Sequence, residues 1–203
     1  MERRVSVAFW LLVVLVAIAL YPGLAPAATV SEPVVLVASS RQDGSPYEQT
    51  VAIVASLPDG GHFGFIVNRP TRFSLQALFP KDEAASKVNQ RVYVGGPTAT
   101  TSVFAVIRSD TVSDGQLRLA PGVVAALDPA AVDAVIRSVP NDARYFLGLM
   151  VWQPGELERE IAESLWEVNR ADADVLFEER TTRGLWNTLR APMAKAAPDG
   201  AML

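Results

Sequence analysis

Residues 145–168 read YFLGLMVWQPGELEREIAESLWEV and carry the strongest structural signal in the chain. The first part, Tyr145–Trp152, is almost wholly apolar, which predicts a central strand buried on both faces. A proline and a glycine then predict a turn. Apolar side chains follow at helical spacing and predict one long helix: Leu157, Ile161, Leu165 and Val168. We expect Trp152 and Trp166 to be buried where this helix packs on the sheet.

Acidic residues are spread along the same predicted helix: Glu156, Glu158, Glu160, Glu163 and Glu167. The first two lie in the first helical turn, where the helix dipole favours negative charge. We interpret the whole set as a solvated helix face.

The rest of the chain alternates strand-length apolar segments with turns and helices. Strands are predicted at 34–38, 50–56, 62–68, 91–94, 103–108, 117–120 and 175–177, and helices at 74–79, 129–139 and 181–189. Pro58–Gly61 predicts the turn of a hairpin, and 117–120 is expected to pair with 103–108. Asp128 followed by Pro129 is a strong helix start. The sequence therefore predicts one mixed domain over 29–192, followed by a disordered tail over 193–203.

The N-terminus has the features of an export signal. Arg3 and Arg4 precede an apolar run from Val5 to Leu20, and Ala25-Pro26-Ala27 follows as a small-x-small cleavage site. Residues 1–28 are therefore expected to be a signal peptide or a retained membrane anchor, with membrane contact through residues 5–20 if the leader is kept. Either membrane alternative leaves the domain outside the cytoplasm, in the periplasm or at the inner membrane, because the arginines stay inside. A misassigned start codon, which would make the protein cytoplasmic, is the third and least favoured alternative.

Composition excludes several kinds of site. The chain has 203 residues, a formal net charge of -4, no cysteine and one histidine, His62. Disulfides, thiolate metal sites and a cysteine nucleophile are impossible, and so is a metal site built from several histidines of one chain. Excess negative charge disfavours a nucleic-acid partner. We expect no metal and no cofactor.

Standard catalytic and nucleotide-binding motifs are missing from the sequence. Three local features remain. His62, after two glycines, is either a general base or a polar residue opening a hairpin strand, and we favour the second because neither a nucleophile nor an orienting acid adjoins it in sequence. Gly95 and Gly96 either expose backbone N–H groups to an anion or allow a tight turn. Trp152–Glu156 is either a helix cap or a ligand position whose acids suit a cation or an amide.

Three strand exits combine polar residues with glycines: Asn68 and Arg69, Gly95 and Gly96, and Trp152 to Glu156. Loops at strand ends carry function more often than strand interiors do. We predict that these exits converge into one ligand site, with Arg69 as a fixed charge and Glu156 as the opposing acceptor. The alternative is that Arg69 and Glu156 pair with each other or cap separate elements.

Several segments carry a family resemblance. They are GFIVNRPT at 64–71, GGP at 95–97, WQPGELEREI at 152–161, Trp166, Leu176-Phe177 and Trp186. In this order, over about residues 34–190, they resemble the YqgE/AlgH family of bacterial proteins. The resemblance implies an α+β single domain with a bent, largely antiparallel or mixed sheet and flanking helices. It implies no settled activity and no established catalytic residues.

The chain also departs from the family pattern. It carries a leader, and Ser39-Ser40 with Asp43–Tyr47 replace the usual end of the first strand and the segment after it. His62 stands where a small residue is usual, and Glu156 where glutamine is common. A family ligand contacting these positions need not transfer to this chain.

The leading functional hypothesis is a non-enzymatic binding or regulatory module, exported from the cytoplasm, that contacts a protein or small-ligand partner. A hydrolase is the alternative, and would require two convergent carboxylates in a deep pocket or a hydroxyl against His62. The family's label of transcriptional regulator is a third reading, disfavoured by the acidic charge and the absence of a helix-turn-helix pattern.

Overall fold

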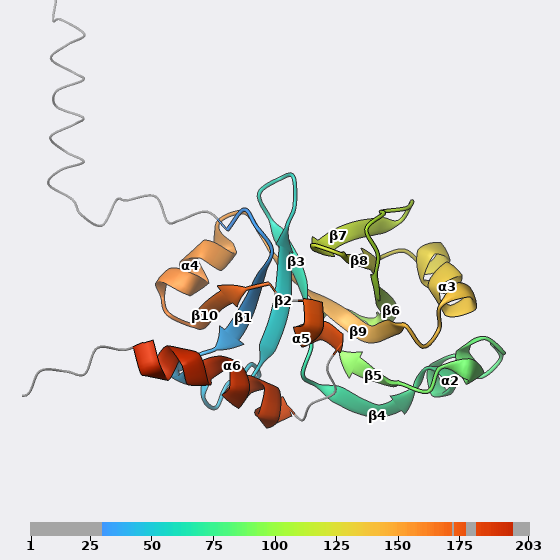
Figure 1. The fold of residues 1–203 in the computed structure, drawn as a ribbon, viewed down its shortest axis with the longest axis horizontal. Coiled ribbons are helices and arrows are strands. Elements are labelled where there is room, and N and C mark those ends of the chain that lie inside the picture. Colours follow the sequence, from blue (N-terminus) through green and yellow to red (C-terminus); the bar gives the residue numbers. More distant parts are fainter. Residues whose placement is uncertain (1–29, 172, 178–181, 197–203) are drawn as a thin grey trace, which may run out of the picture.

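Figure 1 shows the computed structural model, which describes residues 30–171, 173–177 and 182–196. The strands are β1 (Val34–Ala38), β2 (Val51–Ser56), β3 (His62–Ile66), β4 (Pro70–Ser74), β5 (Arg91–Val94), β6 (Thr98–Arg108), β7 (Gln116–Ala120), β8 (Val123–Ala126), β9 (Ala143–Trp152) and β10 (Trp166–Arg170). The helices are α2 (Leu75–Leu78), α3 (Pro129–Ser138), α4 (Glu156–Ala162), α5 (Ala173–Phe177) and α6 (Thr182–Ala196), with short 3-10 turns η2 (Ser40–Gln42) and η3 (Ala85–Lys87).

The strands form one curled sheet in the order β10-β1-β2-β3-β9-β6-β8-β7, with β4 and β5 attached to β9 as a branch. Every pairing is antiparallel except that of β5 with β9. The sheet curls far enough for β2 to contact β7. This architecture confirms the predicted α+β domain with a bent, largely antiparallel sheet and a central β9.

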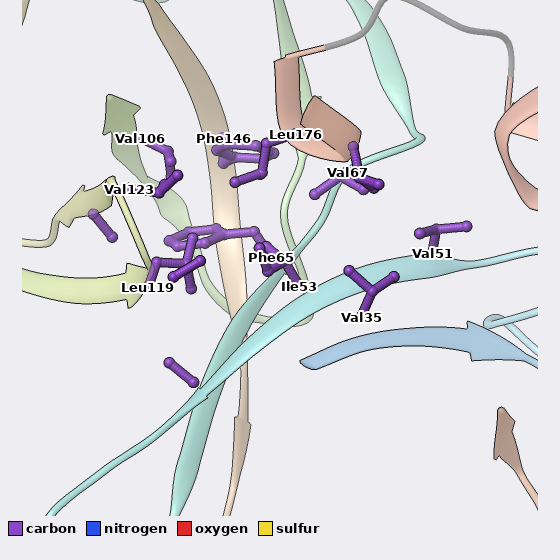
Figure 2. Packing of buried hydrophobic residues seen from close by; sticks show 14 of the residues in the cluster. Val35, Val51, Ile53, Phe65, Val67, Val106, Leu119, Val123, Phe146 and Leu176 are labelled. Atoms are coloured by element: carbon purple, nitrogen blue, oxygen red, sulfur yellow. The ribbon is translucent and has the colours of Figure 1, made fainter. Parts of the chain in front are cut away.

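Successive side chains of β1 and β2 point to opposite faces of the sheet. Both faces are covered, so these side chains enter two separate hydrophobic cores. One face, shown in Figure 2, packs Val35, Ile53 and Phe65 with Phe146, and Leu176 of α5 joins it. The opposite face packs its own buried cluster under α4: Leu36, Ala38, Ala52, Val54, Ile66, Met150, Trp152, Leu157 and Trp166. A third cluster lies under α2 and α3.

Local signals identified the hairpin and α3 correctly. Leu57 N–H donates to Gly61 O at 2.8 Å, and Gly60 takes a φ of 85°, which closes the β2–β3 turn. Asp128 accepts a hydrogen bond from Ala131 N–H at 2.7 Å and caps α3, with Pro129 at its first position.

The predicted long helix from Glu156 to Val168 is wrong, because α4 ends at Ala162 and residues 166–170 form β10. Ser164 takes a φ of 60°, and Leu165 N–H donates back to Glu160 O at 3.0 Å. This is a left-handed helix stop of the Schellman type, which glycine usually marks in a sequence. The helical spacing of Leu165 and Val168 was coincidental.

Other predicted elements also need correction. Residues 175–177 are part of the helix α5 and not a strand, since a three-residue apolar run does not distinguish the two. The strand at 117–120 pairs with β8, which in turn pairs with β6. Strands β4 and β8 were not predicted from the sequence. Strand β6 starts at Thr98, before the predicted 103, and α6 extends into the predicted tail to Ala196.

The predicted leader over residues 1–28 lies outside the described residues. Within the described ranges, no helix combines the length and apolar character that crossing a membrane would require.

Candidate functional site

Two buried tryptophans share one carboxylate beneath α4. Trp152 ends β9 and Trp166 begins β10, and each is only 4% exposed, as predicted. Both indole Nε1–H groups donate to Oε2 of Glu160, at 2.9 Å from Trp152 and 2.7 Å from Trp166. Charge-assisted hydrogen bonds of this kind are stronger than neutral ones. Glu160 therefore ties β9, β10 and α4 together at one point.

A cavity of about 110 Å³ adjoins this carboxylate, and we call it the β9 pocket. Its lining comes from the β1–β2 loop, the β5–β6 link, β9, α4 and β10: Gln42, Tyr47, Pro97, Met150, Val151, Trp152, Glu156, Glu160 and Trp166. The rings of Tyr47 and Trp166 lie 5.9 Å apart at an interplanar angle of 62°. Aromatic surface and two carboxylates thus meet in one small space.

The two carboxylates of the β9 pocket have hydrogen-bond donors but no basic partner. Oε2 of Glu156 accepts the Gln153 backbone N–H at 2.8 Å, and Glu160 accepts the two indoles. Among the described residues, no salt bridge involves either glutamate. The pocket is therefore negatively charged and suits a positively charged or hydrogen-bond-donating group.

The predicted convergence of three strand exits is wrong for Asn68 and Arg69. Strands β3 and β9 are antiparallel, and His62 at the start of β3 pairs with Trp152 at the end of β9. Asn68 and Arg69 follow the opposite end of β3, so they lie away from Trp152 and Glu156. Antiparallel neighbours send their exits to opposite ends of a sheet.

The strand exit formed by Gly95 and Gly96 lies between the other two strand exits. Gly95 N–H donates to Leu147 O at 2.7 Å, while Gly95 O accepts Ile66 N–H at 2.8 Å. A Cβ on Gly95 would overlap Gly148 O, and one on Gly96 would overlap the Leu149 carbonyl. Close backbone packing therefore accounts for both glycines. Only the next residue, Pro97, reaches the β9 pocket.

Asn68 has a structural role that its sequence position does not reveal. It is 1% exposed, and its Oδ1 accepts Val51 N–H at 3.0 Å. Its Nδ2 donates to Gln49 O at 2.8 Å and to Thr182 O at 2.9 Å. Asn68 therefore joins the start of β2 to the start of α6.

Arg69 does not pair with Glu156, and the two side chains instead bond to separate elements, as the second part of the alternative predicted. Its Nη2 donates to Glu48 O at 3.1 Å and to Thr50 Oγ1 at 2.8 Å. Burial lowers the pKa of the Arg69 guanidinium, which still remains charged at neutral pH. Arg69 thus braces the β1–β2 loop that carries Tyr47.

His62 lies beside an acid that the sequence did not reveal. It is 1% exposed, and its Nε2 lies 2.7 Å from Val30 O and 3.8 Å from Oε1 of Glu158. Glu158 is 7% exposed and accepts Val30 N–H at 3.2 Å, and Ser56 Oγ donates to Val30 O at 2.8 Å. The three side chains hold one backbone residue at the start of the described domain.

The predicted solvated helix face is therefore wrong for three of its five members. Glu158 is buried, and Glu160, which lies on another side of α4, holds the two indoles. Glu167 belongs to β10 and forms an ion pair with Arg190 at 3.1 Å.

A larger cavity of about 480 Å³ lies between β6 and α3. Phe79, Val132 and Ile136 contribute apolar walls, and Asp133 at its rim is already paired with Arg137 at 2.9 Å. Across the described residues, no group of three or more histidines and acids could hold a metal ion.

Comparison with known proteins gives a consistent set of relatives. The AlgH-like family model, DUF179, matches residues 35–196. A UPF0301 protein of Pelodictyon phaeoclathratiforme is 29% identical over 160 residues, covering 77% of this chain and 83% of the relative. A UPF0301 protein of Marinomonas is 30% identical over 174 residues, covering 81% and 92% respectively.

Two solved structures share the fold. The AlgH protein from Pseudomonas aeruginosa matches with a TM-score of 0.65 and 21% identity, covering 83% of this chain and 94% of that one. Protein DIP2367 from Corynebacterium diphtheriae matches with a TM-score of 0.63 and 21% identity, covering 89% and 94%. The family match over residues 35–196 shows that the chain belongs to the AlgH-like family.

Proposed function

We propose that this chain is a non-enzymatic binding module, that it works outside the cytoplasm, and that the β9 pocket is its ligand site. One observation carries the proposal. The pocket joins the aromatic side chains of Tyr47, Trp152 and Trp166 to two glutamates that have no basic partner among the described residues. Concave sites with apolar walls and a few polar groups are the usual form of ligand sites.

The surroundings of His62 argue against catalysis. Both His62 Nε2 and Ser56 Oγ approach Val30 O, so the hydroxyl is not hydrogen-bonded to the imidazole. The nearest carboxylate, Glu158, lies near the same ring nitrogen, whereas Nδ1 has no hydrogen-bond partner. A serine–histidine–acid relay needs the hydroxyl on one nitrogen and the acid on the other.

A hydrolase remains the second candidate because Glu156 and Glu160 line one cavity. Paired carboxylates are the usual equipment for acid–base hydrolysis. Against it, Glu160 is committed to two indole hydrogen bonds, and Tyr47 carries the only hydroxyl among the lining residues. Hydrolysis abolished by both Glu156→Gln and Glu160→Gln, but retained in Glu163→Gln, would favour the enzyme.

Export is supported by the basic start, the apolar run and the small-x-small site of the leader. Val30, the first of the described residues, is held between the β2–β3 hairpin and α4.

Co-purification tests the binding function. The full-length chain, tagged at its C-terminus, would be recovered from its native compartment as wild type and as a Glu156→Gln/Glu160→Gln double variant. Glu163→Gln is the matched control, since it removes one exposed acid just after α4. We expect a co-purifying protein or small molecule that the double variant loses and the control keeps. An identical set from all three proteins would contradict the proposal.

A further inference from the structure

We infer that the β9 pocket binds a small organic cation through an alkylated ammonium group. The inference rests on the proposed function, in that it names the ligand class for the same pocket. It is carried by the combination of ring surface, negative charge and small volume at one place.

The walls of the pocket suit a cation with an apolar coat. Tyr47 and Trp166 stand at 62° to each other, 5.9 Å between ring centroids, and Trp152 adds a second indole. Aromatic faces attract ammonium groups through the ring quadrupole, and boxes of such rings are a recurrent solution for methylated ammonium. Met150 and Pro97 complete the apolar lining.

The charge of the pocket selects for cations. Glu156 and Glu160 contribute two carboxylates, and no salt bridge neutralises either within the described part of the chain. Both are only half-buried, so a ligand can reach them from solvent. Anions would be repelled, whereas a cation would supply the opposite charge that the hydrogen-bond donors of the two carboxylates do not.

The lining chemistry separates an organic cation from a metal ion. Calcium and magnesium require about six or more oxygen ligands. Besides rings and aliphatic groups, the side chains lining the pocket offer two carboxylates, the Tyr47 hydroxyl and the Gln42 amide. One oxygen of Glu160 already accepts two indole N–H groups, and Gln42 Oε1 accepts Ser45 Oγ–H. An alkylated ammonium requires no such oxygen shell and gains from the apolar contacts.

The volume sets the size of the group. One water occupies about 30 Å³ of liquid, so the cavity of about 110 Å³ has the space of roughly four waters. A trimethylammonium head, with one nitrogen and a few carbons, matches this space, whereas a nucleotide or a folded peptide does not. The rest of a larger ligand would remain outside the pocket.

Titration of the full-length chain with choline and with tetramethylammonium tests the inference. Trp152 and Trp166 line the pocket, so intrinsic fluorescence reports occupancy, and calorimetry gives an independent value. The control ligand is 3,3-dimethyl-1-butanol, which has the shape of choline without its charge. We expect saturable choline binding that is at least about tenfold tighter than binding of this alcohol.

Variants localise the effect. Glu156→Gln and Glu160→Gln should each weaken choline at least about tenfold, since each removes one charge and keeps an acceptor oxygen. Glu163→Gln should bind as wild type. A weakening of equal size in Glu163→Gln would overturn the inference, because it would show a general charge effect. Far-UV circular dichroism confirms that each variant is folded.

Two ligands distinguish the molecules that could carry the alkylated ammonium group. N-acetyl-trimethyllysine amide represents a side chain of a protein partner, and choline a free solute. Tighter binding of either supports the inference and identifies the source. Equal binding of the neutral alcohol overturns the cation inference but keeps the pocket as a ligand site. Absence of binding by every cation also overturns it, and the co-purification experiment then decides the proposed function separately.

Discussion

Replacing Trp152 with alanine should strongly destabilise the domain. The side chain is 4% exposed and belongs to the core between the sheet and α4. Truncation of a buried large aromatic to alanine costs about 3–5 kcal/mol. The change also removes the hydrogen bond to Glu160, whose net contribution we take as about 1 kcal/mol because water can reach the half-buried carboxylate. We therefore expect a total loss of about 4–6 kcal/mol.

Trp152→Phe separates packing from hydrogen bonding. Phenylalanine keeps most of the ring contact and loses only the indole N–H and part of the volume, so we expect a loss of about 1–2 kcal/mol. In a Glu160→Gln background the same change should cost less, since the partner of the indole is no longer charged. The difference between the two backgrounds measures the coupling directly.

Urea unfolding followed by far-UV circular dichroism is the appropriate assay, because it does not depend on the tryptophan being removed. With an m value of about 2 kcal/mol/M, the alanine variant should lose roughly 2–3 M in midpoint. An unchanged midpoint would show that Trp152 does not support the fold and is available mainly for contacts. A phenylalanine variant as unstable as the alanine variant would refute the division between packing and hydrogen bonding.

Four further outcomes are expected. Burial raises the pKa of the Tyr145 hydroxyl, so on raising the pH this group ionises in the unfolded chain before it does in the folded domain. The contribution of Tyr145 to stability is therefore fully present below about pH 10 and falls by up to about 1.4 kcal/mol per pH unit above it. Tyr145→Phe should flatten this alkaline loss of stability in urea unfolding. Gly96→Ala should lower the melting temperature by more than Gly44→Ala, because the Cβ at 96 would meet the backbone of β9, whereas the Cβ at 44 has open space and only the strain of a φ of 75°. Asn68→Ala should cost about 2–3 kcal/mol in urea unfolding by stripping several buried backbone groups of their partners. An alkaline phosphatase fusion at residue 40 should be active in cells, and a well-expressed but inactive fusion would contradict export.

The sequence predicted correctly those elements that a few neighbouring residues define, such as a turn or a helix cap. The hairpin turn at Pro58–Gly61 and the capped start of α3 at Asp128 are of this kind. Strand β4 escaped prediction because its residues are mostly exposed, and β8 because four residues carry too little pattern. Strand order cannot be deduced from local patterns either, and this is why Arg69 was assigned to the wrong site.

The β9 pocket depends on the end of α4, which the sequence pattern placed six residues too late. A helix continuing through Val168 would have carried Trp166 around its axis and away from Trp152. Because Ser164 reverses the chain in a left-handed conformation, Trp166 instead enters β10, which pairs with β1, and returns beneath α4. Only then can Glu160 accept both indoles and Tyr47 contact the second ring. The left-handed helix stop at Ser164, where glycine is usual, is thus the reason that Glu160 lies in a pocket and not on a solvated helix face.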